Sequence, residues 1–123
     1  YLNEQQLAHQ EISDVWGSLD LLFDCLKNKK GVKFSDKIED LKSSTFIQEN
    51  CPEDLFLKQE IISKIEKIVS KDTVISSSTS SFMPSELQNG CINPERIIVG
   101  HPMNPPHLIP VVEIVLGKAS VKK

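Results

Sequence analysis

The chain has 123 residues, enough for one domain, and carries a formal net charge of −3 at pH 7. A weakly acidic chain gives no reason to expect nucleic acid or an anionic membrane surface as a partner. No apolar run approaches the roughly 20 residues that a membrane-spanning helix needs. We therefore expect no nucleic-acid partner and no membrane partner.

The three cysteines, Cys25, Cys51 and Cys91, are far apart in the sequence and odd in number. No CxxC pair occurs, so the sequence predicts neither a zinc site nor a disulfide framework. Reduced thiols of this kind are typical of cytosolic proteins. We expect a cytoplasmic location and no bound metal.

The first predicted element is an amphipathic helix between residues 2 and 26. Its apolar residues recur at steps of three and four, which places them on one helical face. A coiled-coil seam is the alternative, but it needs a longer repeat than this one. A short helix over residues 36–41, with Ser35 as its N-cap, completes a helical segment over residues 1–44. The residues of the apolar face are Ile12, Val15, Leu19, Leu22 and Leu26.

Residues 45–123 alternate between strand-like and helix-like patterns. Buried strands are predicted over residues 45–48, 73–75, 97–99 and 111–115. A helix is predicted from Pro52 to about Lys71, because Pro and acidic residues favour the first helical turn. A second, short helix is expected over residues 83–87. This order favours an α/β fold with a mainly parallel sheet and helices on its faces.

Polar residues follow three of the predicted strands: Glu49 and Glu53, then the Ser/Thr run at 76–81, then residues 101–104. In parallel sheets, ligands bind beyond the carboxyl ends of the strands. The Ser/Thr run also fits a flexible linker, but core-like apolar residues flank it on both sides. We favour a turn that presents hydroxyls to a ligand, since a hydroxyl both donates and accepts hydrogen bonds.

His101 and Glu113 are the candidate catalytic residues. His101 follows one predicted strand and Glu113 lies inside the next. A carboxylate that fixes one ring nitrogen of a histidine leaves the other free to exchange a proton. The alternative is a loop histidine and a glutamate that faces water from a sheet edge. Helix-dipole stabilisation is a sufficient alternative role for Glu53, and exposure to solvent is one for Lys58.

The motif SSTSS over residues 77–81, followed by HPMNP over residues 101–105 and by Glu113, resembles the 3-hydroxyacyl-CoA dehydrogenase superfamily. That family usually reads S-N-T-S-S and H-F-x-N-P. Here Ser78 stands in place of Asn, and Pro102-Met103 follow the histidine. These departures, and the stretch IQENCPEDLFLKQEI over residues 47–61, resemble the branch that contains lambda-crystallin and L-gulonate 3-dehydrogenase.

The resemblance implies a partial Rossmann-like domain of an NAD-dependent dehydrogenase that oxidises the 3-hydroxyl of a small hydroxy acid, most like L-gulonate. His101 would be the general base, and Glu113 would orient it. Residues 45–123 would form the second half of the dinucleotide-binding domain. The other implied positions are Ser80 and Asn104 for substrate and cofactor, and Glu53 and Lys58 for NAD.

None of the five glycines belongs to a GxGxxG turn, which a dinucleotide-binding domain needs for the pyrophosphate. The family places that turn ahead of Tyr1 and a helical domain beyond Lys123. We therefore expect a fragment that lacks the first βαβ unit and the C-terminal domain, has little activity alone and comes from a homodimeric parent. A 3-hydroxyacyl-CoA dehydrogenase and a non-catalytic, crystallin-like or truncated product are the alternatives.

Overall fold

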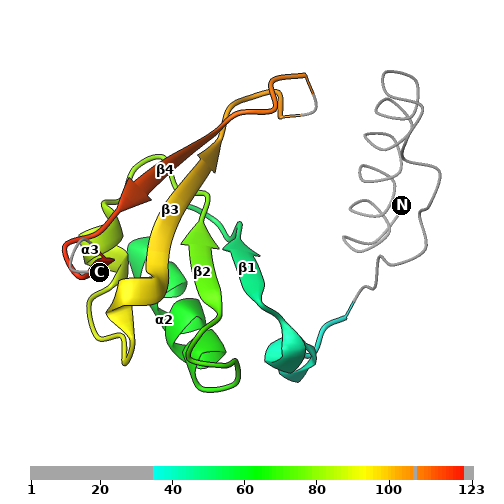
Figure 1. Ribbon diagram of the computed structural model, residues 1–123, viewed down its shortest axis with the longest axis vertical. Helices are drawn as coiled ribbons and strands as arrows, with labels where there is room; N and C mark the ends of the chain where they lie inside the picture. The colour runs from blue at the N-terminus through cyan, green and yellow to red at the C-terminus, as the bar shows by residue number, and fades with distance from the viewer. Residues whose placement is uncertain (1–34, 107, 121–123) are drawn as a thin grey trace.

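The computed structural model describes residues 35–106 and 108–120 (Figure 1). The helix predicted over residues 2–26 lies outside these ranges, and the expected boundary between segments 1–44 and 45–123 stays a prediction. No described helix is long and apolar enough to cross a membrane. The elements are η1 (Ile38–Ser43), β1 (Phe46–Glu49), α2 (Leu55–Glu66), β2 (Val74–Ser77), α3 (Pro84–Leu87), η2 (Pro94–Arg96), β3 (Ile97–Pro102) and β4 (Val112–Leu116).

The four described strands form one sheet in the order β1-β2-β3-β4. β1 pairs with β2 and β2 with β3 in parallel, whereas β3 and β4 are antiparallel. Parallel neighbours need a crossover connection, and the segments that contain α2 and α3 supply the two that this sheet needs. The predicted α/β class with a mainly parallel sheet is confirmed.

The two faces of the sheet differ in what covers them. One face contributes Ile47, Ile75 and Val99 to a buried core, which also contains Ile62 of α2 and Leu87 of α3. Figure 1 shows α2 lying against this part of the sheet. On the opposite face, apolar side chains of the two outer strands are exposed, at 56% for Phe46, 57% for Ile114 and 52% for Leu116.

Helix α2 is shorter than predicted at both ends. It begins at Leu55 rather than at Pro52, because the side chain of Asp54 accepts a 2.9 Å hydrogen bond from the Leu57 amide and caps the helix. It ends at Glu66 rather than near Lys71. The amide of Val69 still bonds to Ile65, so a turn follows the helix and buries Val69 in the core.

Two further boundaries differ from prediction. The short helix expected over residues 36–41 is the 3-10 helix η1, and Ser35 accepts a bond from the Lys37 amide instead of capping it. Strand β3 continues through His101 to Pro102, because its pairing with β4 extends to the Pro102–Val112 pair. His101 therefore lies inside a strand, where the sheet fixes its backbone.

Helix α3 lies within the range predicted for it. The Met83 amide, which precedes the helix, donates a 2.8 Å hydrogen bond to the carboxylate of Glu86. Gly90, at a φ of 79°, supplies the left-handed backbone of the turn that follows. This turn leads the chain through η2 into β3 and thus towards His101.

Candidate active site

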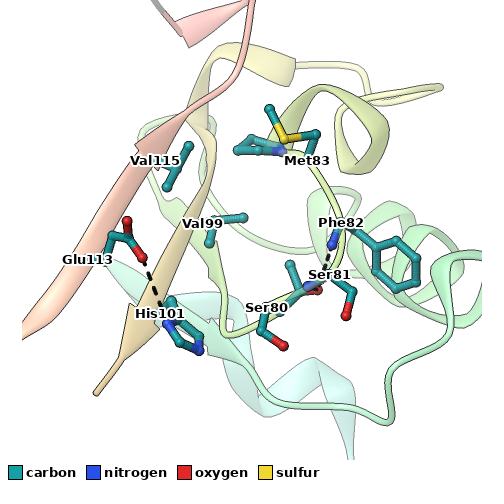
Figure 2. A pocket seen from close by; sticks show the side chains of 10 residues that line it. Ser80, Ser81, Phe82, Met83, Val99, His101, Glu113 and Val115 are labelled. Atoms are coloured by element: carbon teal, nitrogen blue, oxygen red, sulfur yellow. Dashed lines mark hydrogen bonds and ion pairs between the residues drawn. The ribbon is translucent and has the colours of Figure 1, made fainter.

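His101 and Glu113 occupy directly opposed positions on β3 and β4. Paired positions of an antiparallel ladder point their side chains to the same face. The distance from His101 Nδ1 to Glu113 Oε2 is 4.0 Å (Figure 2). That is an ion-pair distance for a protonated imidazole and is too long for a hydrogen bond, as is common before a ligand draws catalytic groups together. The structure thus brings the two predicted catalytic residues together.

A cavity of about 210 Å³ lies beside this pair. The loop between β2 and α3 forms one wall with the hydroxyls of Ser80 and Ser81, and Val99 and Val115 form an apolar wall (Figure 2). Pockets that hold a whole drug-sized ligand measure roughly 300–1,000 Å³. The cavity therefore fits a single ring or a short acid rather than a complete dinucleotide.

The Ser/Thr run forms the cavity wall because backbone and side-chain hydrogen bonds fix its path. The Ser78 amide bonds to the Glu49 carbonyl at 2.9 Å. The Ser81 amide donates to Glu53 Oε1 at 3.0 Å, and the Thr79 hydroxyl donates to the same oxygen. The run is therefore a bonded turn with Ser80 at the cavity, which supports the turn hypothesis over the linker.

Lys58 is buried beneath this turn, with 1% of its side chain exposed. Its Nζ lies 3.0 and 3.2 Å from the two oxygens of Glu49 and 2.8 Å from the Cys51 carbonyl oxygen. A further contact joins it to Glu53 at 3.4 Å. An ammonium group has three donors, and these contacts use all of them. Lys58 does not line the cavity, so its predicted contact with NAD stays a prediction.

Glu53 lies just ahead of α2 and points to the Ser/Thr turn. The hydrogen bond from Thr79 lowers the pKa of Glu53 below its ordinary value, against the opposing effect of desolvation, and the Ser81 amide and Lys58 lower it further. The carboxylate is therefore ionised at neutral pH and remains an acceptor for the turn.

Asn104 is not brought to the His101–Glu113 pair. It is exposed in the connection between β3 and β4 and does not line the cavity. Its predicted contacts with substrate and cofactor stay predictions. The sequence analysis did not single out Thr79, whose partner Glu53 is separated from it by 26 positions, and no local sequence pattern marks such a distant pair.

Residues 23–123 match the family model described as the NAD-binding domain of 3-hydroxyacyl-CoA dehydrogenase. The chain belongs to the 3-hydroxyacyl-CoA dehydrogenase family. This match confirms the superfamily that the motifs at 77–81 and 101–105 indicated, and with it the partial Rossmann fold. The family description names NAD, the cofactor that the resemblance implied.

Relatives in the family refine the comparison. The chain is 41% identical over 118 residues to an L-carnitine dehydrogenase of Oceanobacillus iheyensis, covering 93% of this chain and 38% of the relative. It is 47% identical over 85 residues to an Agrobacterium fabrum L-carnitine dehydrogenase/betainyl-CoA thioesterase, covering 69% of this chain and 18% of the relative. The chain thus spans well under half the length of these relatives.

A solved structure shares the fold at a TM-score of 0.80 and 26% identity, covering 96% of this chain and 40% of the other. It is a 5-formyl-3-hydroxy-2-methylpyridine 4-carboxylic acid 5-dehydrogenase, described as an NAD⁺-dependent dismutase. The lambda-crystallin branch expected from Ser78, Pro102-Met103 and residues 47–61 has no specific support in these relatives and stays a prediction.

Proposed function

We propose that this chain forms the nicotinamide-side part of an NAD-dependent dehydrogenase that oxidises the 3-hydroxyl group of a small hydroxy acid. The observation that carries the proposal is the cross-strand pair of His101 and Glu113 beside a hydroxyl-lined cavity. In this proposal His101 is the general base, Glu113 orients it, and Ser80 holds the substrate oxygen.

The chemistry assigned to these residues follows from the weak acidity of an alcohol. His101 takes the hydroxyl proton on Nε2, and the carboxylate of Glu113 stabilises the resulting imidazolium through Nδ1. A positioned base of this kind contributes roughly 10²–10⁴ in rate. The Ser80 hydroxyl donates a hydrogen bond to the substrate oxygen, and Val99 and Val115 supply the apolar wall beside it.

When bound, NAD supplies the hydride acceptor. The cavity beside His101 is of a size for a nicotinamide ring, and its mixed polar and apolar walls suit an aromatic amide. Asn104, Glu53 and Lys58 remain the further positions that the family resemblance assigns to substrate or cofactor. No residue of this chain is assigned to the adenosine side of NAD, since the chain contains no GxGxxG turn.

Among possible substrates, the names of the relatives favour L-carnitine over the L-gulonate expected from the sequence. Both compounds are 3-hydroxy acids, so His101 as the base and the Ser80 hydroxyl as the oxygen-binding group suit either substrate. A 3-hydroxyacyl-CoA thioester is the second candidate, because the matched family carries that substrate in its name. We propose a cytoplasmic enzyme and leave the homodimer as a prediction for the longer protein.

A segment exchange tests the proposal. The part of this chain that aligns with the Oceanobacillus iheyensis L-carnitine dehydrogenase replaces the corresponding segment of that relative, which supplies the rest of the protein. NADH formation is followed with L-carnitine, L-gulonate and 3-hydroxybutyryl-CoA. We expect turnover with at least one, favouring L-carnitine, and a loss of about 10²–10⁴ in kcat for His101→Gln.

The controls separate chemistry from folding. Glu60→Gln is expected to keep the activity of the exchanged protein, because Glu60 pairs with Lys64 on the exposed side of α2 and does not line the cavity. The isolated chain is expected to give little or no NADH with L-gulonate or L-carnitine. A folded exchanged protein in which His101→Gln retains full turnover contradicts the assignment of the base.

A further inference from the structure

The turn that carries Ser80 depends on side-chain acceptors. The amide of Thr79 donates to Ser77 Oγ at 3.3 Å, and the amide of Phe82 donates to Thr79 Oγ1 at 3.2 Å. The amide of Ser81 reaches Glu53 Oε1 at 3.0 Å and Thr79 Oγ1 at 3.2 Å. Loss of these acceptors leaves the turn without the hydrogen bonds that define its path.

The hydroxyls that accept from these amides donate in turn to two carboxylates. Ser77 Oγ donates to Glu49, and Thr79 Oγ1 donates to Glu53. Both carboxylates meet the buried ammonium of Lys58. Amide, hydroxyl, carboxylate and ammonium thus form one continuous network, in which each bond polarises the next.

Glu53 is the exposed one of the three charged groups in this network. Its side chain is 39% exposed, against 1% for both Glu49 and Lys58. Glu49 and Lys58 are enclosed beneath the turn, whereas Glu53 contacts Thr79 and Ser81, the two neighbours of Ser80. Fixing the residues on both sides of Ser80 fixes the direction in which its hydroxyl enters the cavity.

We infer that Glu53 is a positioning residue, which sets the place of Ser80 at the cavity through its bonds to Thr79 and Ser81. The inference rests on the proposed function, in which Ser80 holds the substrate oxygen. It gives Glu53 an effect on the reaction that does not require contact with NAD. The two roles differ in outcome: lost positioning lowers kcat, whereas a lost cofactor contact raises the KM for NAD.

The pH dependence of the turn provides the first test. The pKa of Glu53 lies below its ordinary value, chiefly because of the bond from Thr79. A lowered pKa means that the network is intact at neutral pH and is lost as the pH falls through that pKa. In the ¹⁵N-labelled 123-residue chain, we expect the Ser81 amide resonance to titrate with a midpoint below about 4.3, the ordinary value for Glu.

Glu53→Gln is expected to abolish this titration of Ser81. Glu60→Gln is the matched control, because Glu60 is exposed and pairs with Lys64 within α2; it should leave the titration unchanged. A Ser81 resonance that titrates at the ordinary value, or equally in Glu53→Gln, overturns the inference. This measurement needs no dehydrogenase activity, so its failure and the failure of the proposed function are distinguishable.

The second test uses kinetics in the exchanged protein. We expect Glu53→Ala and Thr79→Val, which each remove an acceptor of the turn, to lower kcat on the order of tenfold or more, as a misplaced substrate contact does. The KM for NAD should change less than about twofold. Thr73→Val is the control for loss of a buried threonine hydroxyl, since Thr73 bonds to the Ser44 carbonyl far from the turn; it should leave kcat unchanged. A rise in the KM for NAD at constant kcat overturns the positioning role.

Discussion

Lys58 is the residue whose environment departs furthest from a sequence-based expectation. A lysine on the first turns of a helix is ordinarily exposed, yet Lys58 is 1% exposed. A buried ammonium is tolerated where every proton has a partner, and Glu49, Glu53 and the Cys51 carbonyl supply those partners. Breaking such a pair strongly destabilises the fold, because removal of one member leaves the charge of the other buried without a partner.

Lys58→Met is expected to lower the free energy of unfolding by about 3–5 kcal/mol, since it strands the buried carboxylate of Glu49. Lys64→Met is the matched control, because Lys64 is 56% exposed; it should change stability by less than about 0.5 kcal/mol. Urea unfolding measures both.

If Lys58→Met does not fold, Glu49→Gln combined with Lys58→Met removes both charges and is expected to recover part of the loss. A Lys58→Met chain as stable as the Lys64→Met chain contradicts the assignment of Lys58 as a buried ion-pair partner.

Cys91 is protected from thiol chemistry by its surroundings. Burial, reinforced by Glu66, raises the pKa of Cys91 to about 11. At pH 8 roughly one such thiol in a thousand is ionised, against about a quarter at the ordinary pKa. We expect iodoacetamide to alkylate Cys91 on the order of a hundredfold more slowly in the folded chain than in urea. Peptide mass spectrometry measures this rate for each cysteine, and equal rates in both states contradict it.

At the scale of the elements, the strands were predictable and the ends of elements were not. Short β-branched runs place β1, β2, β3 and β4 within a few residues of their observed bounds, because local pattern marks a buried strand. The start of α2 was misplaced because the side chain of Asp54 caps the helix, which leaves Pro52 and Glu53 ahead of it. Glu53 bonds to Thr79 instead, and the local pattern contains no record of that contact between distant segments.

The same distinction applies to the candidate site. The pairing of His101 with Glu113 was predictable, because two strands joined by a short connection are ordinarily neighbours. The extension of β3 through Pro102 was missed, because the ladder with β4 determines it. The network beneath the turn was missed as well, since it joins residues on β1, α2 and the loop after β2.

A substitution at Gly100 tests the register between β2 and β3. A Cβ at this position would collide with the hydroxyl of Ser76, a buried oxygen without a hydrogen-bond partner. Gly100→Ala is expected to lower stability by about 1–3 kcal/mol through overpacking. Ser76→Ala alone should leave stability nearly unchanged, because no hydrogen bond is lost. Combined with Gly100→Ala, it should restore much of the stability that Gly100→Ala removes. Thermal unfolding of the three variants measures this, and additive losses argue against the contact.

Across the whole molecule, burial falls from the centre of the sheet to β4. Ile75 is completely buried, whereas Val112 and Ile114 are more than half exposed. Figure 1 shows β4 and the end of β3 extending beyond the helices. Stability within one fold follows the density of apolar contacts, so the strand that carries Glu113 is expected to be held less firmly than the strand that carries the central core.

Amide hydrogen exchange measures this gradient. We expect the amide of Ile75 to exchange only through global unfolding and the amide of Val112 to exchange on the order of a hundredfold faster or more. The Met103 amide, which bonds to the Val111 carbonyl at 3.0 Å, should resemble Val112. Equal protection of Ile75 and Val112 contradicts the gradient.

The weak coverage of β4 has a consequence for recognition. A ligand that contacts Glu113 must also order β4, the strand that carries this residue. Part of the binding free energy is therefore spent on restricting the motion of β4. Ligand affinity then also depends on the opposite face of the sheet. Side chains there, such as Ile114 and Leu116, do not contact the ligand, but they determine how well β4 is ordered before the ligand binds.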